Sequence, residues 1–150
     1  YDKKQIELIG VEAGGPKSSK LHAAPLTNGA KLGILHGAAA YVCQNSEGQI
    51  NDTASISAGL DYPGVSPIHC FLKDTKRARY TSATDEAALN AYKLVTKLEK
   101  INPSLEPSHA FAEAIKIAPK LSKDTIIIVN SCGDAKKDRD ILKERLGKIN

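Results

Sequence analysis

The sequence predicts an α/β fold in which a mostly parallel sheet lies between helices as three layers. Segments typical of strands alternate with segments typical of helices, which is the pattern of that fold class. The clearest strand is residues 125–129, an apolar run without polar alternation, as in a strand buried in a parallel sheet. The clearest helix follows Thr84, a typical N-cap with Asp85 and Glu86 behind it, and its apolar spacing extends over about 16 residues.

The first half of the chain is predicted to contain little regular structure. Glycine, proline, serine and asparagine are frequent there, and these residues favour turns and loops. We expect, in order, a strand over residues 6–11, a turn at Gly14-Gly15, a loop over 16–31, an extended segment over 34–44 and a mostly irregular loop over 55–67.

The second half is predicted to be richer in helices. Pro103 should end the long helix, and Pro107 suits a first helical position. We expect, in order, a short helix over residues 66–75, a strand over 79–83, the long helix, a helix over 107–117, the strand over 125–129 and a closing helix over 135–146.

Composition limits the class of protein. The 150 residues are 41% hydrophobic and 25% charged, which is ordinary for one soluble domain, and no apolar run approaches the ~20 residues of a membrane span. The net charge of +4 is spread along a chain with 5% aromatics, which argues against nucleic-acid binding. Cys43, Cys70 and Cys132 form neither a paired framework nor CxxC spacing, which favours a reducing, cytoplasmic compartment. The absence of Met and the start at Tyr1 suggest a fragment of a longer chain.

Four motifs each allow a functional and a purely structural interpretation. Gly14-Gly15 could hold an anion or make a tight turn. Asp61 lies in a loop dense in glycine and proline, where either a functional carboxylate or a simple turn fits. Glu106 could cap a helix or point into a cleft, and Cys132, directly after an expected strand, could contact a ligand or close a turn.

Several segments, in one order, resemble the tryptophan synthase beta chain family. Residues 55–65, Ser-Ile-Ser-Ala-Gly-Leu-Asp-Tyr-Pro-Gly-Val, are the most specific match. The others are residues 10–15, 22–26, 33–37, 77–80, 84–89, 105–110 and 129–130, so the resemblance spans nearly the whole chain. It implies the C-terminal domain of a fold-type II enzyme that uses pyridoxal phosphate (PLP) to make L-tryptophan from L-serine and indole.

The resemblance also implies roles for individual residues. Glu106 would assist catalysis beside the cofactor ring, and Asp61 would close the site over the substrate hydroxyl. Cys132 stands where the family has a serine facing the pyridine nitrogen, and it is likewise neutral. Gly59 and Gly133 would bring backbone close to the cofactor.

Four further residues are matched at the edge of that site. Leu35 and His36 would line the route by which indole arrives from an alpha subunit. The backbone carbonyls of Tyr62 and Gly64 would bind a monovalent cation. Asp134 departs from the family, which has an arginine there, and this reverses a charge near the cofactor.

The family's Schiff-base lysine and glycine-rich phosphate loop would lie upstream of Tyr1. We therefore expect that the 150 residues alone neither hold PLP nor catalyse. The implied partners are that missing N-terminal domain, an alpha subunit or domain and a second beta chain, but neither nucleic acid nor membrane. A truncated sheet should also expose an edge and apolar faces, which favours self-association.

Two other readings remain open. The chain could be a stand-alone, non-catalytic binding or scaffold module that kept the fold. A different β-replacing PLP enzyme, such as a cysteine synthase, would fit the fold class but not residues 55–65.

Overall fold

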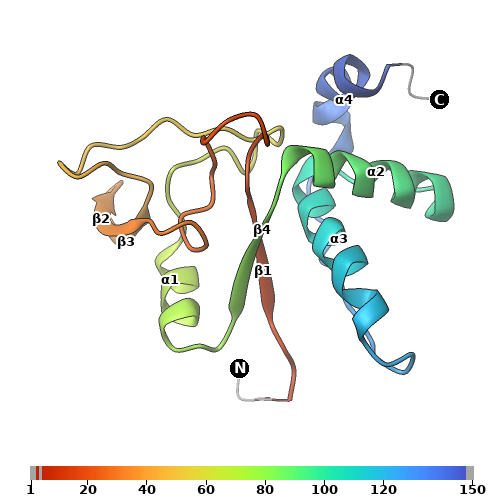
Figure 1. Cartoon of the computed structure of the whole chain (residues 1–150), viewed down its shortest axis with the longest axis horizontal. Coiled ribbons are helices and arrows are strands. Elements are labelled where there is room, and N and C mark those ends of the chain that lie inside the picture. The colour runs from red at the N-terminus through yellow and green to blue at the C-terminus, as the bar shows by residue number, and fades with distance from the viewer. Residues whose placement is uncertain (1–2, 4, 148–150) are drawn as a thin grey trace.

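The structure is a computed structural model and describes residue 3 and residues 5–147 (Figure 1). The elements in chain order are β1 (Ile9–Ala13), β2 (Lys31–Leu35), β3 (Ala38–Val42), α1 (Pro67–Asp74), β4 (Arg79–Ala83), α2 (Asp85–Glu99), α3 (Leu105–Ile117), the 3-10 helices η1 (Ala118–Lys120) and η2 (Ala135–Asp138), and α4 (Arg139–Leu146). No helix in this described part of the chain is long and apolar enough to cross a membrane.

A parallel strand pair forms the centre of the molecule. β1 pairs with β4 in parallel, from Ile9 opposite Arg79 to Ala13 opposite Ala83. Helices α2 and α3 lie on one side of the pair, and α1 with the β2–β3 hairpin lies on the other (Figure 1). The prediction of an α/β fold with a parallel sheet is therefore confirmed, and the strand over 79–83 is found where it was expected. β1 lies a few residues later than the expected strand over 6–11.

The β2–β3 hairpin was only partly predicted. Its two-residue turn is His36-Gly37, and both have positive φ, at 51° and 78°. Positive φ at both central positions matches the twist of the flanking strands. β2 begins at the end of the expected loop and its last two residues fall in the expected extended segment, but the sequence did not indicate a strand there because Leu32 and Ile34 are exposed and no residue of β2 is fully buried.

The helical layer is built by local signals and one apolar cluster. The Thr84 hydroxyl accepts a hydrogen bond from the Ala87 N–H at 3.3 Å, so the predicted cap is confirmed. α2 ends at Glu99, before Pro103, because Lys100 takes the left-handed conformation with φ 58°. The cluster that joins α2 to the later helices comprises Tyr92, Leu105 and Leu142, with Ile56, Leu89, Ile141 and Leu146 packed against it.

Residues 125–129 are not a strand, so this prediction is wrong. They pair with no strand in the described part of the chain, and Ile126 and Ile128 are 85% and 90% exposed. A strand needs a neighbour for its backbone N–H and C=O groups, and apolar composition does not supply one. The closing helix is also divided, since η2 precedes α4.

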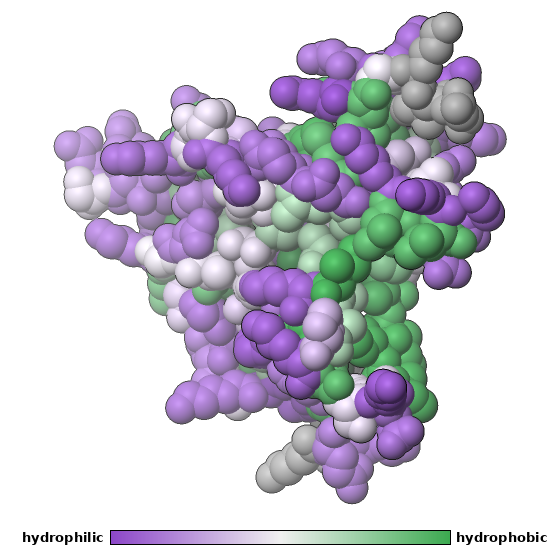
Figure 2. Space-filling model, turned by 45° about the vertical axis from the view of Figure 1, so that its right-hand side comes forward, coloured by the Kyte–Doolittle hydropathy of each residue, from purple (hydrophilic) through white to green (hydrophobic). Residues whose placement is uncertain are grey.

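Large apolar side chains are exposed around the helical layer. Figure 2 shows apolar side chains gathered on this side of the molecule. Those on α2, α3 and the segments that follow them are Leu94, Leu98, Ile101, Ile115, Leu121, Ile126, Ile127 and Ile128. Exposed apolar surface of this kind is typical of a face that another surface covers.

Candidate active site

The Glu106 carboxylate joins three segments that are far apart in sequence. Glu106 is the second residue of α3, and its Oε1 accepts from Lys137 Nζ at 2.6 Å and from the Gly59 N–H at 3.2 Å. The side chain is 14% exposed. Because Ser104 occupies the N-cap position, Glu106 does not cap the helix and instead reaches across to its neighbours.

The environment of Glu106 keeps it ionised. Burial by itself would raise the pKa of this carboxyl group, but hydrogen bonding, first of all from Lys137, outweighs burial and lowers the pKa to about 2. The group is therefore a carboxylate at neutral pH. It can stabilise positive charge, whereas a carboxyl with so low a pKa is a weak proton acceptor.

The segment after the 125–129 run is held onto the start of α3. The Ser104 hydroxyl donates to the Cys132 carbonyl at 2.8 Å, and the buried Asp138 carboxylate accepts from the Leu105 N–H at 2.7 Å. Lys137 Nζ also contacts Asp138 Oδ1 at 2.8 Å. Asp138 thus satisfies a free amide of the first turn of α3 from 33 residues away, a contact that no local sequence signal indicates.

Two glycines that the sequence resemblance assigned to the cofactor site let the backbone approach Glu106 closely. A Cβ on Gly59 would collide with Glu106 Oε1. A Cβ on Gly133 would collide with the Ser104 hydroxyl and lie 3.2 Å from Glu106 Oε2, and Gly133 has φ 88°. The structure therefore brings Gly59, Gly133 and Glu106 together, as expected of one site, with the neighbouring Cys132 exposed.

The predicted residues at the edge of the site form a second group. The Tyr62 hydroxyl and His36 Nδ1 lie 2.8 Å apart, with ring centroids at 5.8 Å. A Cβ on Gly64 would lie 2.7 Å from Leu35 Cδ2, so this pair is also in contact. All four residues therefore lie together, where the hairpin meets residues 62–64.

Asp61 and Asp134 have different surroundings. Asp61 is exposed on the loop that carries Gly59, and its N–H donates to the Ser57 carbonyl at 3.0 Å. Asp134, the departure from the family pattern, accepts from the Lys136 N–H at 2.9 Å and caps η2. The reversed charge thus has a local structural role at this position.

The Gly14-Gly15 pair makes a tight turn. The Gly14 N–H donates to the Ala83 carbonyl at 2.7 Å, and a Cβ on Gly15, which has φ 72°, would collide with the Leu21 carbonyl. These groups are already engaged with backbone, so the geometry favours the turn over an anion site.

A cavity of about 350 Å³ lies between β1 and residues 59–66. Gly59, Tyr62 and Gly64 line it, so it connects the two groups of predicted residues. Glu12 and Tyr80 line its other side. Burial raises the pKa of Glu12, although hydrogen bonds from Thr27 and from the Leu26 N–H partly offset this.

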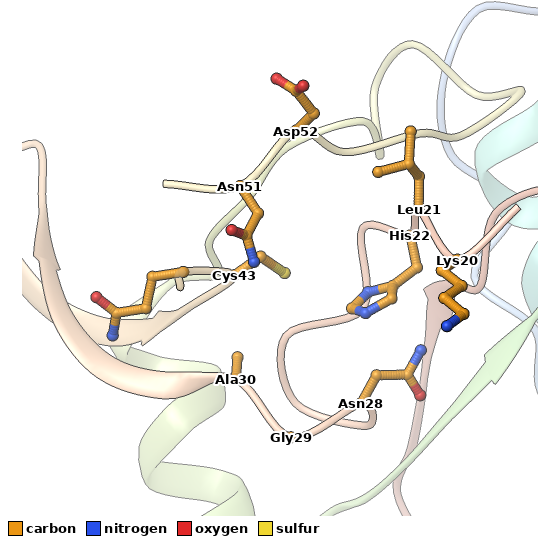
Figure 3. Close-up of a pocket in the computed structure, with 10 residues that line it drawn as sticks. Lys20, Leu21, His22, Asn28, Gly29, Ala30, Cys43, Asn51 and Asp52 are labelled. Carbon is orange, nitrogen blue, oxygen red and sulfur yellow. The ribbon is translucent and has the colours of Figure 1, made fainter. Parts of the chain in front are cut away.

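A separate cavity of about 300 Å³ lies away from all predicted site residues (Figure 3). Its lining is largely polar and comes from residues 20–30, 43–44 and 51–52, with His22, Asn28 and Cys43 around it. Burial raises the pKa of the Cys43 thiol, so this thiol is protonated at neutral pH.

The parallel strand pair flanked by helices, with an ionised carboxylate at the start of one of them, places the chain among α/β proteins. No family model matches the chain. It is 51% identical over 145 residues to the tryptophan synthase beta chain of Bordetella petrii, a match that covers 96% of this chain and 36% of that protein.

Other beta chains give similar matches. The chain is 52% identical over 134 residues to that of Chromobacterium violaceum, and 48% identical over 146 residues to that of Rhodopseudomonas palustris. These matches cover 89% and 97% of this chain but only 34% and 36% of the relatives. Almost the whole chain is therefore homologous to a stretch of the tryptophan synthase beta chain that makes up about a third of each relative's length. The resemblance to this family is confirmed.

Proposed function

We propose that the chain is the C-terminal domain of a tryptophan synthase beta chain, a fold-type II PLP-dependent lyase that joins L-serine and indole by β-replacement. The observation that supports this most directly is the ionised Glu106 held between Gly59 and Lys137. In this arrangement the carboxylate that the resemblance gives a catalytic role lies against Gly59 and Gly133, the glycines that it places next to the cofactor. The sequence matches to beta chains support the same activity.

The surroundings of Glu106 fit one edge of PLP. Gly59 and Gly133 present backbone without side chains, Cys132 offers a neutral thiol, and Glu106 Oε2 is buried with no hydrogen-bond partner among the described residues. We place Cys132 at the pyridine nitrogen and Glu106 beside the ring. When bound, PLP supplies the electron sink for replacing the serine hydroxyl.

The chain's own residues then have separate tasks. Cys132, being neutral, leaves the pyridine nitrogen without a charged partner. Glu106 stabilises positive charge next to it, and while it is paired with Lys137 it stays ionised at neutral pH. Asp61, on the loop that Gly59 anchors, meets the substrate hydroxyl and closes the site.

The second group of residues would serve delivery and ion binding. We propose that Leu35 and His36 line the indole route from an alpha subunit, and that the Tyr62 and Gly64 carbonyls bind a monovalent cation. Contact between these residue pairs supports one shared location. A dimer of beta chains and the N-terminal domain would cover the exposed apolar face. Free cysteines throughout the described residues fit a cytoplasmic compartment.

The 150 residues alone are proposed to be inactive, because the phosphate loop and the Schiff-base lysine would be supplied from upstream. The test compares this chain with the full encoded protein for PLP absorbance and for tryptophan formation from L-serine and indole. We expect both signals only in the full protein, with tryptophan formation lost in Glu106→Ala. A full protein that binds no PLP would instead support a non-catalytic scaffold, and turnover by the 150 residues would refute their inactivity.

A further inference from the structure

Three buried polar atoms on the segments that meet at Glu106 have no hydrogen-bond partner within the described residues. They are Ser57 Oγ, Glu106 Oε2 and His109 Nε2, and the first two lie where residues 57–59 contact the carboxylate. Ser57 is fully buried. A buried hydroxyl and a buried carboxylate oxygen without partners are each costly, so two on adjoining segments indicate an interaction that the fold prepares for.

The backbone brings these two atoms towards each other. Gly59, two residues after Ser57, donates its N–H to Glu106 Oε1 at 3.2 Å, so residues 57–59 lie against the carboxylate. The position of Ser57 is itself constrained, because its N–H donates to Ser55 Oγ at 3.0 Å and its carbonyl accepts from the Leu60 and Asp61 N–H groups at 3.0 Å. The hydroxyl therefore belongs to a rigid turn next to Glu106.

The groups around Glu106 leave its Oε2 atom free to accept a hydrogen bond from Ser57 within the described residues. Lys137 binds Oε1 and is shared with Asp138, while His109, one turn along α3, is buried with its Nδ1 at 2.8 Å from the Leu105 carbonyl. Burial raises the pKa of Glu106. Hydrogen bonding from Lys137, from backbone and from neighbouring hydroxyls, including that of Ser57, lowers it. Ser57 is thus close enough to influence the pKa of Glu106, although its hydroxyl forms no hydrogen bond to the carboxylate in this arrangement.

We propose that Ser57 is a positioning residue for Glu106, whose hydroxyl closes onto Oε2 and holds the carboxylate against the 57–61 turn when Lys137 withdraws. Lys137 is 40% exposed and has room to withdraw, whereas Ser57 is fully buried in its turn, so only its hydroxyl has to rotate. Ser57 would then keep Glu106 aligned and would tie the turn before Asp61 to α3. The catalytic part of this proposal rests on the proposed function, but the contact itself does not.

The test measures the pKa of Glu106 by ¹³C NMR in the full encoded protein labelled at glutamate Cδ, with Glu106→Gln identifying the signal. A Lys137→Met background brings the titration up from about 2 into a range where the protein can be studied folded. In that background we expect Ser57→Ala to raise the pKa of Glu106 by about one unit, as expected for the loss of a hydrogen bond to a charged group.

Thr96→Val is the matched control, because Thr96 Oγ1 on α2 is also buried without a partner in the described chain. It should leave the Glu106 titration unchanged. Ser57→Cys, which nearly keeps the volume but donates weakly, should resemble Ser57→Ala and serves if that variant folds poorly. Equal titrations in Ser57→Ala and Thr96→Val would overturn the proposal.

Steady-state kinetics with Lys137 present separate this proposal from the proposed function. We expect Ser57→Ala to lower kcat for tryptophan formation about tenfold with little change in KM for L-serine, as for lost alignment. If the NMR shift is found but the full protein makes no tryptophan, the contact stands and the proposed function fails. If tryptophan forms normally in Ser57→Ala and no shift is seen, the positioning role fails alone.

Discussion

Replacing Lys137 by methionine tests the electrostatic account of Glu106. Lys137 is the first of the groups that lower the pKa of Glu106 from 4.5 to about 2. A depression of that size corresponds to ~3 kcal/mol of stability at neutral pH. Because Lys137 is 40% exposed and screened by solvent, we expect its removal to cost only about 1–2 kcal/mol.

The pH dependence gives the sign of the effect. A carboxyl whose pKa is lowered on folding stabilises the protein above its unfolded pKa of 4.5, and this contribution is lost as pH falls towards 2. Urea unfolding of Lys137→Met should therefore differ from the parent protein at pH 7 and differ less at pH 3. Lys136→Met, next to it and outside the Glu106 pair, is the control. A loss for Lys136→Met as large as for Lys137→Met, or a difference that does not shrink at low pH, would refute the reasoning.

Three other predictions follow from packing, burial and exposure. Gly59→Ala should lower the free energy of unfolding by about 1–3 kcal/mol and move Glu106, because a Cβ there collides with Oε1. Thermal unfolding and the Glu106 titration would show both effects, and an unchanged midpoint of thermal unfolding would count against the contact. Burial lowers the pKa of His109 below 6.5, so the unfolded chain gains its proton first and stability should fall as pH drops below 6.5. In urea unfolding measured at several pH values, the stability of His109→Gln should depend less on pH than that of the parent protein. An equal pH dependence in the two proteins would contradict this account. Ile126→Lys with Ile128→Lys should change stability by less than about 0.5 kcal/mol and reduce self-association in sedimentation velocity, whereas unchanged association would place the contact elsewhere.

Local signals in the sequence were sufficient for part of the fold. Thr84, the two acidic residues after it and the apolar spacing behind them predicted α2, because capping and helical periodicity act within a few residues. The strand over 79–83 was also predicted from its own residues and is found paired with β1. The motif over residues 55–65 was enough to indicate the family, since its order of residue types is specific.

Other features depended on partners far along the chain. Residues 125–129 have the composition of a buried strand, but no neighbouring strand pairs with them in the described chain, so they remain irregular and exposed. The start of α3 was misplaced because Asp138, from a distant segment, satisfies the Leu105 N–H two residues before Pro107. Hydrogen-bond partners of this kind leave no local pattern to read.

The candidate site shows the same division. The sequence by itself determined which residue types were available: the Glu106 carboxylate, the Gly59 and Gly133 backbones and the neutral Cys132. Only the tertiary structure showed that Lys137 pairs with Glu106 and keeps it ionised, and that the turn carrying Ser57 lies against it. The physical reason is that a pKa and a hydrogen bond depend on distance and burial, which arise when segments separated by tens of residues pack together.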